Sequence, residues 1–551
     1  MVKRILVGSE ASYLNTGYAS YGRELIKRLI ATGKYEVAEM SCYGACDDDR
    51  RKEIPWKNYP VAPSRADSDE VKKAYSSNPA NQFGAWRFER MCLDFKPDVA
   101  LMQKDPWMDS WVKQSPFRPF FSWSWASTVD SAPQNPEWIH QFADADYFYT
   151  LSEWAEGVIK EQAGDSVDLI GSVTMCAADE FKPVPNKAAH RLSMGLDPDW
   201  KIIGTVMRNQ RRKLFPDLLE AFSMYLAYTG DEKTYLYCHT SYPDNGWDLP
   251  QLMMKYGISS RVLFTYACEE CKSLAIGKFS DSIKQCKNCK KYASKLSSVS
   301  NGATTEELAK IYNLFDLYIQ HSNSEGMGIG QLEAAACAVP IMSTDYSAME
   351  SIVRKLNGYP MPIKAMALEL ETGCYRAIPD VDEIVSYWKM FFGLSSEDRI
   401  KAGQAARSAY EANFNWDEVL RKWMISLDDA PKANWNAPFR QIRIPQVEEI
   451  PKFNNNKEFL DWAVSAYLPY SGLQNSYEIL CLLRDLNFQS FKPNPCGYFY
   501  SESSYFNRVG FMDFTRDHVL NMFKSKAETF NFWESVRCDK RKLQQEDWLN
   551  D

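Results

Sequence analysis

Short apolar runs alternate with amphipathic stretches along the first 175 residues of the chain. Residues 24–30 have apolar positions at helical spacing. Runs typical of buried strands lie at 5–7, 36–40, 98–102, 120–125 and 147–151. Alternating strand and helix signals are typical of a parallel, doubly wound sheet. We therefore expect an α/β fold with a Rossmann-like domain over residues 1–175.

A second series of the same kind begins at Lys201, after a polar, proline-containing hinge at 176–200. Helical spacing recurs at 215–226 and 305–312. Strand-like runs lie at 201–207, 234–239, 261–266, 316–320 and 340–344. The series predicts a second Rossmann-like domain over 176–428, interrupted just after Tyr266 by an insertion at 267–300.

The last part of the chain, 429–551, has another character, and we interpret it as a C-terminal extension. Residues 430–455 are rich in Pro and Asn, and Phe491–Phe514 contains eight aromatic residues among Ser, Asn and Gly. The aromatic segment is either a packed cap on the body or an acceptor-contacting surface that stacks planar rings.

Charge and composition limit the classes of partner. The net charge is −8 and the pI is about 5.5, so no general basic field favours nucleic acid or an anionic membrane. No apolar run reaches the length of a membrane span, and residues 1–9 predict a strand entering a turn rather than a signal peptide. We expect a cytoplasmic protein without a membrane partner.

Four of the fourteen cysteines form two C-x-x-C pairs, Cys268/Cys271 and Cys286/Cys289, with fourteen residues between the pairs. Two such turns complete a tetrahedral thiolate site, which predicts a structural Zn²⁺ in a zinc-ribbon insertion. A redox pair is the alternative. Segment 272–295 also carries seven lysines opposed within it only by Asp281, so the insertion either contacts a polyanion or has a soluble exterior.

Candidate chemistry lies around the segment Ser324–Ala336. Three glycines occupy five positions, 326 to 330, just before a predicted helix. Uncovered N–H groups and a helix N-terminus predict an anion seat, flanked here by the carboxylates of Glu325 and Glu333. A ligand with phosphate in the middle and hydroxyl groups at both ends, such as a nucleotide-sugar, suits this pattern. The alternative is a glycine-rich turn into a core helix.

A basic run follows the strand-like segment 201–207 and extends from Arg208 to Lys213. Cations at the end of a parallel strand lie at the usual ligand edge of an α/β sheet. Arg208 and Lys213 therefore suit a diphosphate, the arginine by its planar fork and the lysine as a point charge. A solvated basic turn is the alternative.

Together, these motifs resemble the retaining glycosyltransferases of family 4, which have the GT-B fold. That family carries two glutamates separated by seven residues, matched by Glu325 and Glu333, and an Arg…Lys pair, matched by Arg208 and Lys213. The resemblance covers residues 1 to about 428, where 411–427 is similar to the family's closing helix. The insertion and the block 345–350 resemble a bacteriophage-encoded branch.

The resemblance implies residue roles. The implied catalytic residues are Glu325, Arg208, Lys213 and Asp130, the last on the acceptor side of the cleft. The implied donor-binding residues are Gly17, Arg208, Lys213, Glu325, Gly326, Met327, Gly328, Ile329, Gly330 and Glu333. The chain departs from the family at Met327, where Phe is usual, and at Gly330, where Pro is common.

The predicted activity is transfer of a sugar, with retention, from a nucleotide-sugar, most simply a UDP-sugar. No catalytic metal is expected, because we interpret Asp144-Ala-Asp146 as a capping and surface acid rather than a metal-binding D-x-D. The phage-like features predict 5-hydroxymethylcytosine in duplex DNA as acceptor and glucose or arabinose as sugar, in a host cytoplasm. The alternatives are a surface polysaccharide or small-molecule acceptor, and a non-catalytic nucleic-acid-binding protein on this scaffold.

Overall fold

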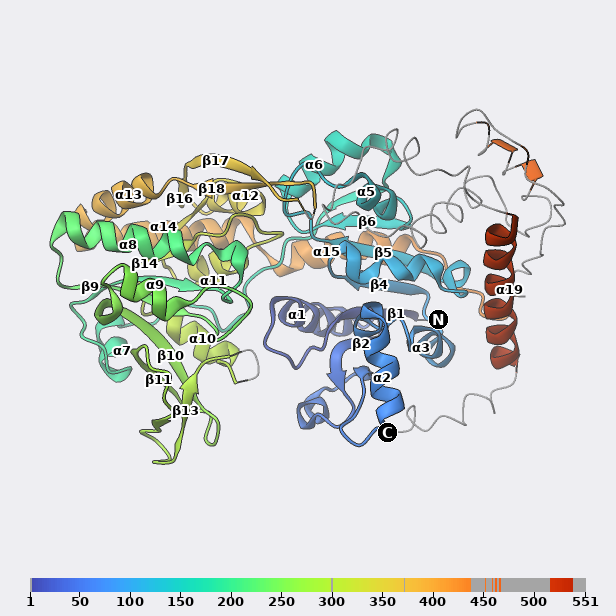
Figure 1. Cartoon of the computed structure of the whole chain (residues 1–551), viewed down its shortest axis with the longest axis horizontal. Helices are drawn as coiled ribbons and strands as arrows, with labels where there is room; N and C mark the ends of the chain where they lie inside the picture. The colour runs from blue at the N-terminus through green and yellow to red at the C-terminus, as the bar shows by residue number, and fades with distance from the viewer. Residues whose placement is uncertain are drawn as a thin grey trace.

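A computed structural model describes residues 2–298, 301–370, 372–437 and 516–538, with single positions at 451, 458, 461, 462, 465 and 466. Two α/β halves lie side by side along the long axis of the molecule, each built around its own sheet (Figure 1). The predicted aromatic segment Phe491–Phe514 lies outside the described residues.

The first half is a seven-stranded sheet in which every pair of neighbours is parallel, in the order β3-β2-β1-β4-β5-β6-β7. Its strands are β1 (Lys3–Glu10), β2 (Tyr35–Ala45), β3 (Lys57–Ala62), β4 (Val99–Gln103), β5 (Ser122–Ser127), β6 (Tyr147–Thr150) and β7 (Leu169–Ser172). Its helices are α1 (Gly17–Ala31), α2 (Asp69–Ser77), α3 (Phe88–Phe95), α4 (Pro106–Asp109), α5 (Pro136–Phe142) and α6 (Glu153–Ala163). This order is the doubly wound arrangement that the sequence predicts.

The second half repeats that arrangement with six parallel strands in the order β10-β9-β8-β14-β15-β16. They are β8 (Lys201–Val206), β9 (Thr234–His239), β10 (Val262–Cys268), β14 (Leu317–Gln320), β15 (Ile341–Thr344) and β16 (Tyr359–Met361). The helices of this half are α7 (Lys187–Ser193), α8 (Phe215–Thr229), α9 (Leu249–Lys255), α10 (Thr305–Tyr312), α11 (Gly330–Ala336), α12 (Ala348–Lys355), α13 (Val381–Gly393) and α14 (Ser396–Asn413).

Two small antiparallel units extend the second half. The insertion contributes β11 (Leu274–Lys278), β12 (Lys284–Gln285) and β13 (Tyr292–Leu296), of which β11 and β13 pair with β10. Strands β17 (Ile363–Leu368) and β18 (Tyr375–Pro379) form a separate hairpin. The hairpin lies beside α6 of the first half, where the two halves meet (Figure 1).

Local sequence explains where these elements begin and end. The central strands β4 and β5 are buried along their whole length, because helices cover both faces of a parallel sheet. Helix α10 begins at a capping box, in which Thr304 accepts from the amide of Glu307 and Glu307 accepts from the amide of Thr304. The apolar pattern misses β3, β7 and β16, because β3 carries Lys and Pro, β7 has Gly171, and β16 is only three residues long.

The predicted closing helix at 411–427 is wrong in one respect, because the structure divides it in two. Helix α14 ends at Asn413, and α15 (Trp416–Asp429) begins after Asn415, whose side chain accepts from the amide of Asp417 at 2.7 Å. Helix α15 returns to the first half. There the indole of Trp423 donates to the Tyr21 hydroxyl at 2.8 Å.

Part of the extension also packs on the first half. The indole Nε1 of Trp435 donates to the carbonyl oxygen of Pro97 at 3.0 Å, and its ring stacks on Phe120. Helix α19 (Arg516–Cys538) lies along the same side (Figure 1), and Arg537 donates to the carbonyl oxygen of Trp435 at 3.0 Å. This described part of the extension is therefore a packed cover of the first sheet domain.

Candidate functional site

The candidate site is a cleft of about 540 Å³ between the two halves. It lies at the switch points of both sheets, between β1 and β4 in one and between β8 and β14 in the other, where ligands bind in open α/β sheets. Its lining includes all eleven residues that the sequence predicts for catalysis and donor binding: Gly17, Asp130, Arg208, Lys213, Glu325, Gly326, Met327, Gly328, Ile329, Gly330 and Glu333.

Glu325 is the buried centre of a polar network on the second half, with 6% of its surface exposed. Its carboxylate accepts from Arg212 at 2.7 Å, and it also accepts from Lys213. Further bonds come from Ser322 at 2.5 Å and Gln320 at 2.9 Å. Burial acts to raise the pKa of Glu325, but Arg212 and Lys213 outweigh it and hold that pKa below its usual range. The group is therefore a fixed carboxylate.

Lys213 lies against this carboxylate and lines the cleft. Burial, with a smaller effect from neighbouring Arg212, lowers the pKa of Lys213 to about 8. Two cations on one buried carboxylate leave an excess of positive charge at this wall. Such an excess suits an anionic group in the cleft.

The structure separates the predicted arginine from this network. Arg208 lines the cleft, but its guanidinium is half-exposed and donates to Asp244 at 3.1 and 2.8 Å. Arg212 is the arginine that contacts Glu325, and the sequence reasoning missed it. Arg212 reaches the site because a 3₁₀ turn at Arg211–Lys213 directs residues 212 and 213 to the same side. The identity of the residues alone does not indicate this turn.

Two glycines of the loop are required by geometry. A Cβ on Gly326 would lie 2.4 Å from Cγ2 of Thr128 on the opposite half, so only glycine permits this approach between the halves. Gly328 has φ +72°, in the left-handed region that side chains rarely adopt. The helix that follows, α11, has only seven residues, so the uncovered amides before it contribute more to an anion seat than the predicted helix does.

Gly330, one of the two departures from the family pattern, has a local explanation. A Cβ at this position would lie 2.1 Å from the hydroxyl of Tyr318. Tyr318 in turn donates to Gln320, which donates to Glu325. The tyrosine that excludes a larger residue at 330 is therefore part of the network behind the carboxylate.

Glu333 is buried on α11 and accepts from the hydroxyl of Tyr312 at 2.7 Å. Burial raises the pKa of Glu333 to about 7, although the bond from Tyr312 opposes this effect. Glu333 lines the same cleft as Glu325, but from α11 rather than from the loop before that helix. The two glutamates thus differ in charge state near neutral pH, one always ionised and the other close to its midpoint.

The first half contributes an acidic wall that the sequence reasoning missed. Glu10 ends β1, Asp105 follows β4, and both line the cleft. Burial raises the pKa of each. Asp105 accepts from Tyr18 at 2.6 Å and also accepts from Thr128. Their position at the carboxyl ends of two predicted strands was the available signal.

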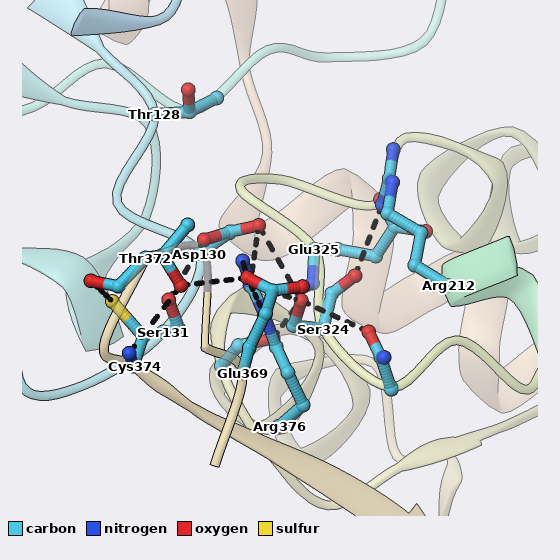
Figure 2. A network of polar contacts seen from close by, with 12 residues as sticks. Thr128, Asp130, Ser131, Arg212, Ser324, Glu325, Glu369, Thr372, Cys374 and Arg376 are labelled. Carbon is cyan, nitrogen blue, oxygen red and sulfur yellow. Dashed lines mark hydrogen bonds and ion pairs between the residues drawn. The ribbon is translucent and has the colours of Figure 1, made fainter. Parts of the chain in front are cut away.

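Asp130, the predicted acceptor-side acid, also lines the cleft and makes an ion pair with the second half. Its carboxylate is 2.7 Å from Arg376 of β18 (Figure 2). Arg376 also donates to Ser324, next to Glu325, at 2.6 Å. No local pattern indicated Arg376, which lies far along the chain in a short hairpin.

The four predicted cysteines converge, with ligand atoms that all lie within 4.8 Å of one another. The Sγ atoms of Cys268 and Cys289 are 3.6 Å apart, as are those of Cys271 and Cys286. Zn–S bonds of about 2.3 Å in a tetrahedron require sulfur atoms about 3.8 Å apart, so the cluster fits that ion.

The lysine-rich surface of the insertion is partly neutralised. Lys291 pairs with Glu270 at 2.6 Å and Lys295 pairs with Glu269 at 2.8 Å, so acids just before the segment oppose two of the seven lysines. The Asp144-Ala-Asp146 motif lies apart from the cleft residues. Asp144 pairs with Lys113 at 3.2 Å and is largely covered, whereas Asp146 is exposed, as the sequence suggested.

Two facing, doubly wound parallel sheets with a cleft at both switch points define a GT-B-like α/β fold, which confirms the predicted fold class. Residues 280–368, which include Glu325 and Glu333, match the family described as "Glycosyl transferases group 1". This segment is therefore similar to the group 1 glycosyl transferases.

Individual relatives agree with that class. The UDP-N-acetylglucosamine--peptide N-acetylglucosaminyltransferase GtfA subunit of Streptococcus pneumoniae serotype 4 is 27% identical over 126 residues, which are 22% of this chain and 23% of the relative. The chain thus matches about a quarter of the length of its curated relatives.

Solved structures show the same fold over most of the chain. Sucrose-phosphate synthase from Thermosynechococcus elongatus has a TM-score of 0.57 at 15% identity, covering 78% of this chain and 98% of its own. HepE of Anabaena, in complex with UDP-glucose, has a TM-score of 0.52 at 10% identity, covering 78% and 100%. Among the helices that the structure describes, none combines the length and apolar content needed to cross a membrane.

Proposed function

We propose that the protein is a retaining glycosyltransferase of family 4 that transfers a sugar from a nucleotide-sugar, with UDP as the nucleotide. The observation that carries this proposal is the cluster of Arg212 and Lys213 on Glu325, which faces the glycine loop in a cleft at both switch points. The HepE structure with UDP-glucose supports UDP as the nucleotide.

We assign the donor to the second half of the cleft in the following orientation. Its diphosphate lies between Lys213, Arg208 and the amides of Met327 to Gly330, and Arg208 exchanges Asp244 for a phosphate oxygen. Its sugar hydroxyls donate to Glu325, and its ribose hydroxyls donate to Glu333. Gly17 of the first half closes over the donor.

The chemistry follows from charge. Cleavage of the sugar–phosphate bond develops negative charge on the leaving diphosphate, and cations already fixed in the cleft stabilise it without reorganisation. Glu325 is held by two cations, so it is a poor nucleophile and suits hydroxyl recognition instead. We therefore favour a front-face displacement in which the leaving phosphate takes the acceptor proton.

The acceptor enters along the first half, whose wall carries Glu10, Asp105 and Asp130. Carboxylates accept hydrogen bonds from hydroxyl groups and repel phosphate, so this wall favours a neutral, polyhydroxylated acceptor. The second candidate is 5-hydroxymethylcytosine in duplex DNA, with glucose or arabinose as the sugar. It is favoured by exposed lysines of the insertion, including Lys278, Lys287 and Lys290.

For the insertion we propose a structural Zn²⁺ held by Cys268, Cys271, Cys286 and Cys289. Four thiolates fill the tetrahedral coordination sphere, so such an ion has no open position for substrate. Its contribution is to hold the two turns of the insertion together.

The decisive experiment combines nucleotide-sugars with three acceptors: a neutral oligosaccharide, unmodified duplex DNA and duplex DNA with hydroxymethylated cytosine. Mass spectrometry of the products identifies sugar and acceptor together. We expect transfer from a UDP-sugar, abolished in Lys213→Ala and retained in Arg211→Ala, whose exposed side chain does not line the cleft. Lack of both UDP binding and turnover in the wild-type protein would overturn the proposal.

A further inference from the structure

Arg376 lies where the two halves of the molecule meet, and it contacts both of them. Its guanidinium is 2.7 Å from Asp130 on the first half and 2.6 Å from Glu369 on the second. It also donates to the hydroxyl of Ser324, the residue before Glu325, at 2.6 Å (Figure 2). One side chain thus touches the acceptor wall and the donor loop.

Backbone bonds reinforce this contact. The amide of Tyr375 donates to the carbonyl oxygen of Ala132 on the first half at 3.0 Å, which forms an isolated antiparallel bridge. The amide of Ala132 donates to the hydroxyl of Tyr346 at 3.0 Å, and that hydroxyl donates to the Tyr375 carbonyl at 2.8 Å. The hairpin β17–β18 therefore joins the halves beside the ion pair.

The same hairpin also forms a backbone hydrogen bond with the donor loop. The amide of Ala377 donates to the carbonyl oxygen of Asn323 at 3.0 Å. Arg212, from the other side, donates to the carbonyl oxygen of Ser324 at 3.0 Å and to the Glu325 carboxylate at 2.7 Å. Ser324, the residue before Glu325, is consequently bound by two arginines.

The electrostatics keep Arg376 in place. Only 12% of its side chain is exposed. Burial acts to lower the pKa of Arg376, but Asp130 and Glu369 outweigh it and raise that pKa. A planar guanidinium serves two carboxylates and a hydroxyl at once, which an ammonium group does less well.

We propose that Arg376 is a positioning residue for sugar transfer, which aligns Asp130 on the acceptor wall with Ser324–Glu325 on the donor wall when the two halves are in contact. This role rests on the proposed function. Loss of Arg376 separates the alignment of the walls from binding of the diphosphate, because the groups that we assign to the diphosphate, Arg208, Lys213 and the loop amides, all belong to the second half.

The test compares Arg376→Ala, Arg376→Lys and Asp130→Asn with the control Arg354→Ala. Arg354 makes an ion pair with Asp345, at 2.6 Å, within the second half only. We expect Arg376→Ala to lower kcat by about tenfold to 100-fold, since misplacement of reacting groups acts on the chemical step. Its Kd for UDP, measured by calorimetry, stays unchanged.

The conservative variants add a readout that general destabilisation does not give. Arg376→Lys recovers part of kcat, because it restores the charge without the fork. Asp130→Asn lowers kcat, and the double variant Asp130→Asn/Arg376→Ala is no slower than the slower single variant, because both remove one shared interaction. A wild-type kcat in Arg376→Ala, or additive losses in the double variant, would overturn the proposal.

Hydrogen exchange separates this inference from the proposed function. Faster exchange in segments 128–134 and 363–370 of Arg376→Ala or Arg376→Lys, but not of Arg354→Ala, supports the contact between the halves whatever the reaction. If the wild-type protein neither binds UDP nor transfers sugar, the proposed function fails while the exchange result still decides the contact. If it transfers sugar and Arg376→Ala exchanges and turns over like wild type, only the role of Arg376 fails.

Discussion

At the scale of single residues, Arg212 is the side chain whose role differs most from what the sequence suggested. It is the arginine that contacts Glu325, whereas Arg208 points to Asp244. We predict that Arg212→Ala lowers kcat/KM by about 100-fold, because one of the two cations that hold Glu325 at the donor wall is lost. Steady-state kinetics check this, with Arg211→Ala as the matched control. Equal activities in the two variants would contradict it.

Glu333 provides a second residue-scale prediction, in pH dependence. Burial raises its pKa to about 7, and only the ionised carboxylate accepts from both ribose hydroxyls. Calorimetric affinity for UDP should therefore increase from pH 6 to pH 8, by up to about tenfold per pH unit below the midpoint. In Glu333→Gln the part of this increase that comes from the carboxyl should be absent, so the slope of affinity against pH should be smaller than in the wild-type protein. A flat profile in the wild-type protein would contradict the assignment.

The same residue affects stability with a definite sign. The pKa of Glu333 in the folded protein, about 7, lies above its ordinary value of 4.5. Its contribution is thus fully present below pH 4.5 and is lost as the pH rises through 7, because the unfolded chain ionises first. Thermal melts of Glu333→Gln should lack this part of the decline.

Residue identity and spacing predicted which residues line the cleft but not how they pair. Glu325, Lys213 and the glycines occupy loops between predictable strands, so their common location follows from the topology. The choice of Arg212 over Arg208 depends on a single 3₁₀ turn. The pairing of Asp130 with Arg376 depends on how the halves approach, and neither property is local in sequence.

At the scale of elements, the cysteine insertion forms part of the cleft as well as an edge of the sheet. The amide of Ser297 donates to the carbonyl oxygen of Thr265 at 3.0 Å, and Asn301 donates to that of Ala267 at 3.1 Å. Ser297 and Ser298 then line the cleft. The thiolate turns therefore support one wall of the donor site, through the last residues of β10.

This arrangement predicts that loss of the metal weakens donor binding. We expect elemental analysis to find one zinc ion per chain in the wild-type protein and none in Cys289→Ser. It should also weaken UDP binding severalfold, because the supported wall loosens. Cys46→Ser, a partly buried cysteine outside the cluster, is the control and should change neither property. Full UDP affinity in a zinc-free Cys289→Ser protein would contradict the coupling.

Secondary structure was predictable wherever apolar runs were long. Every strand-like run in the two series is a strand, because parallel strands buried on both faces are rich in apolar residues. The hairpin β17–β18 was not predicted, since most of β17 is exposed and the hairpin is stabilised by its contacts at the junction of the halves. Its burial pattern reflects tertiary position rather than local periodicity.

At the scale of the whole molecule, helix α15 carries the chain from the second half back to the first. Besides the bond from Trp423, the last turn of α15 is bound by Lys3, which donates to the carbonyl oxygen of Leu427 at 2.7 Å. The ring centroid of Trp423 lies 4.7 Å from that of Tyr149 on β6 of the first sheet. Helix α15 thus follows the second half in sequence but packs on the first half. The relative position of the two halves depends on this helix.

We therefore predict that Trp423→Ala affects both halves together. Removal of a fully buried indole costs about 3–5 kcal/mol of unfolding free energy, because it leaves a cavity and removes the bond that the indole donates to the Tyr21 hydroxyl. The control is Ile425→Ala on the same helix, whose side chain is exposed and whose loss costs about 0.5 kcal/mol or less. Denaturant unfolding gives both free energies, and calorimetry of thermal unfolding provides a second measurement. Since α15 positions the first half against the donor-binding half, Trp423→Ala should also lower kcat at temperatures where it remains folded, with UDP affinity retained. A loss of UDP affinity equal to the loss of kcat would instead place the damage within the second half and contradict this role of α15.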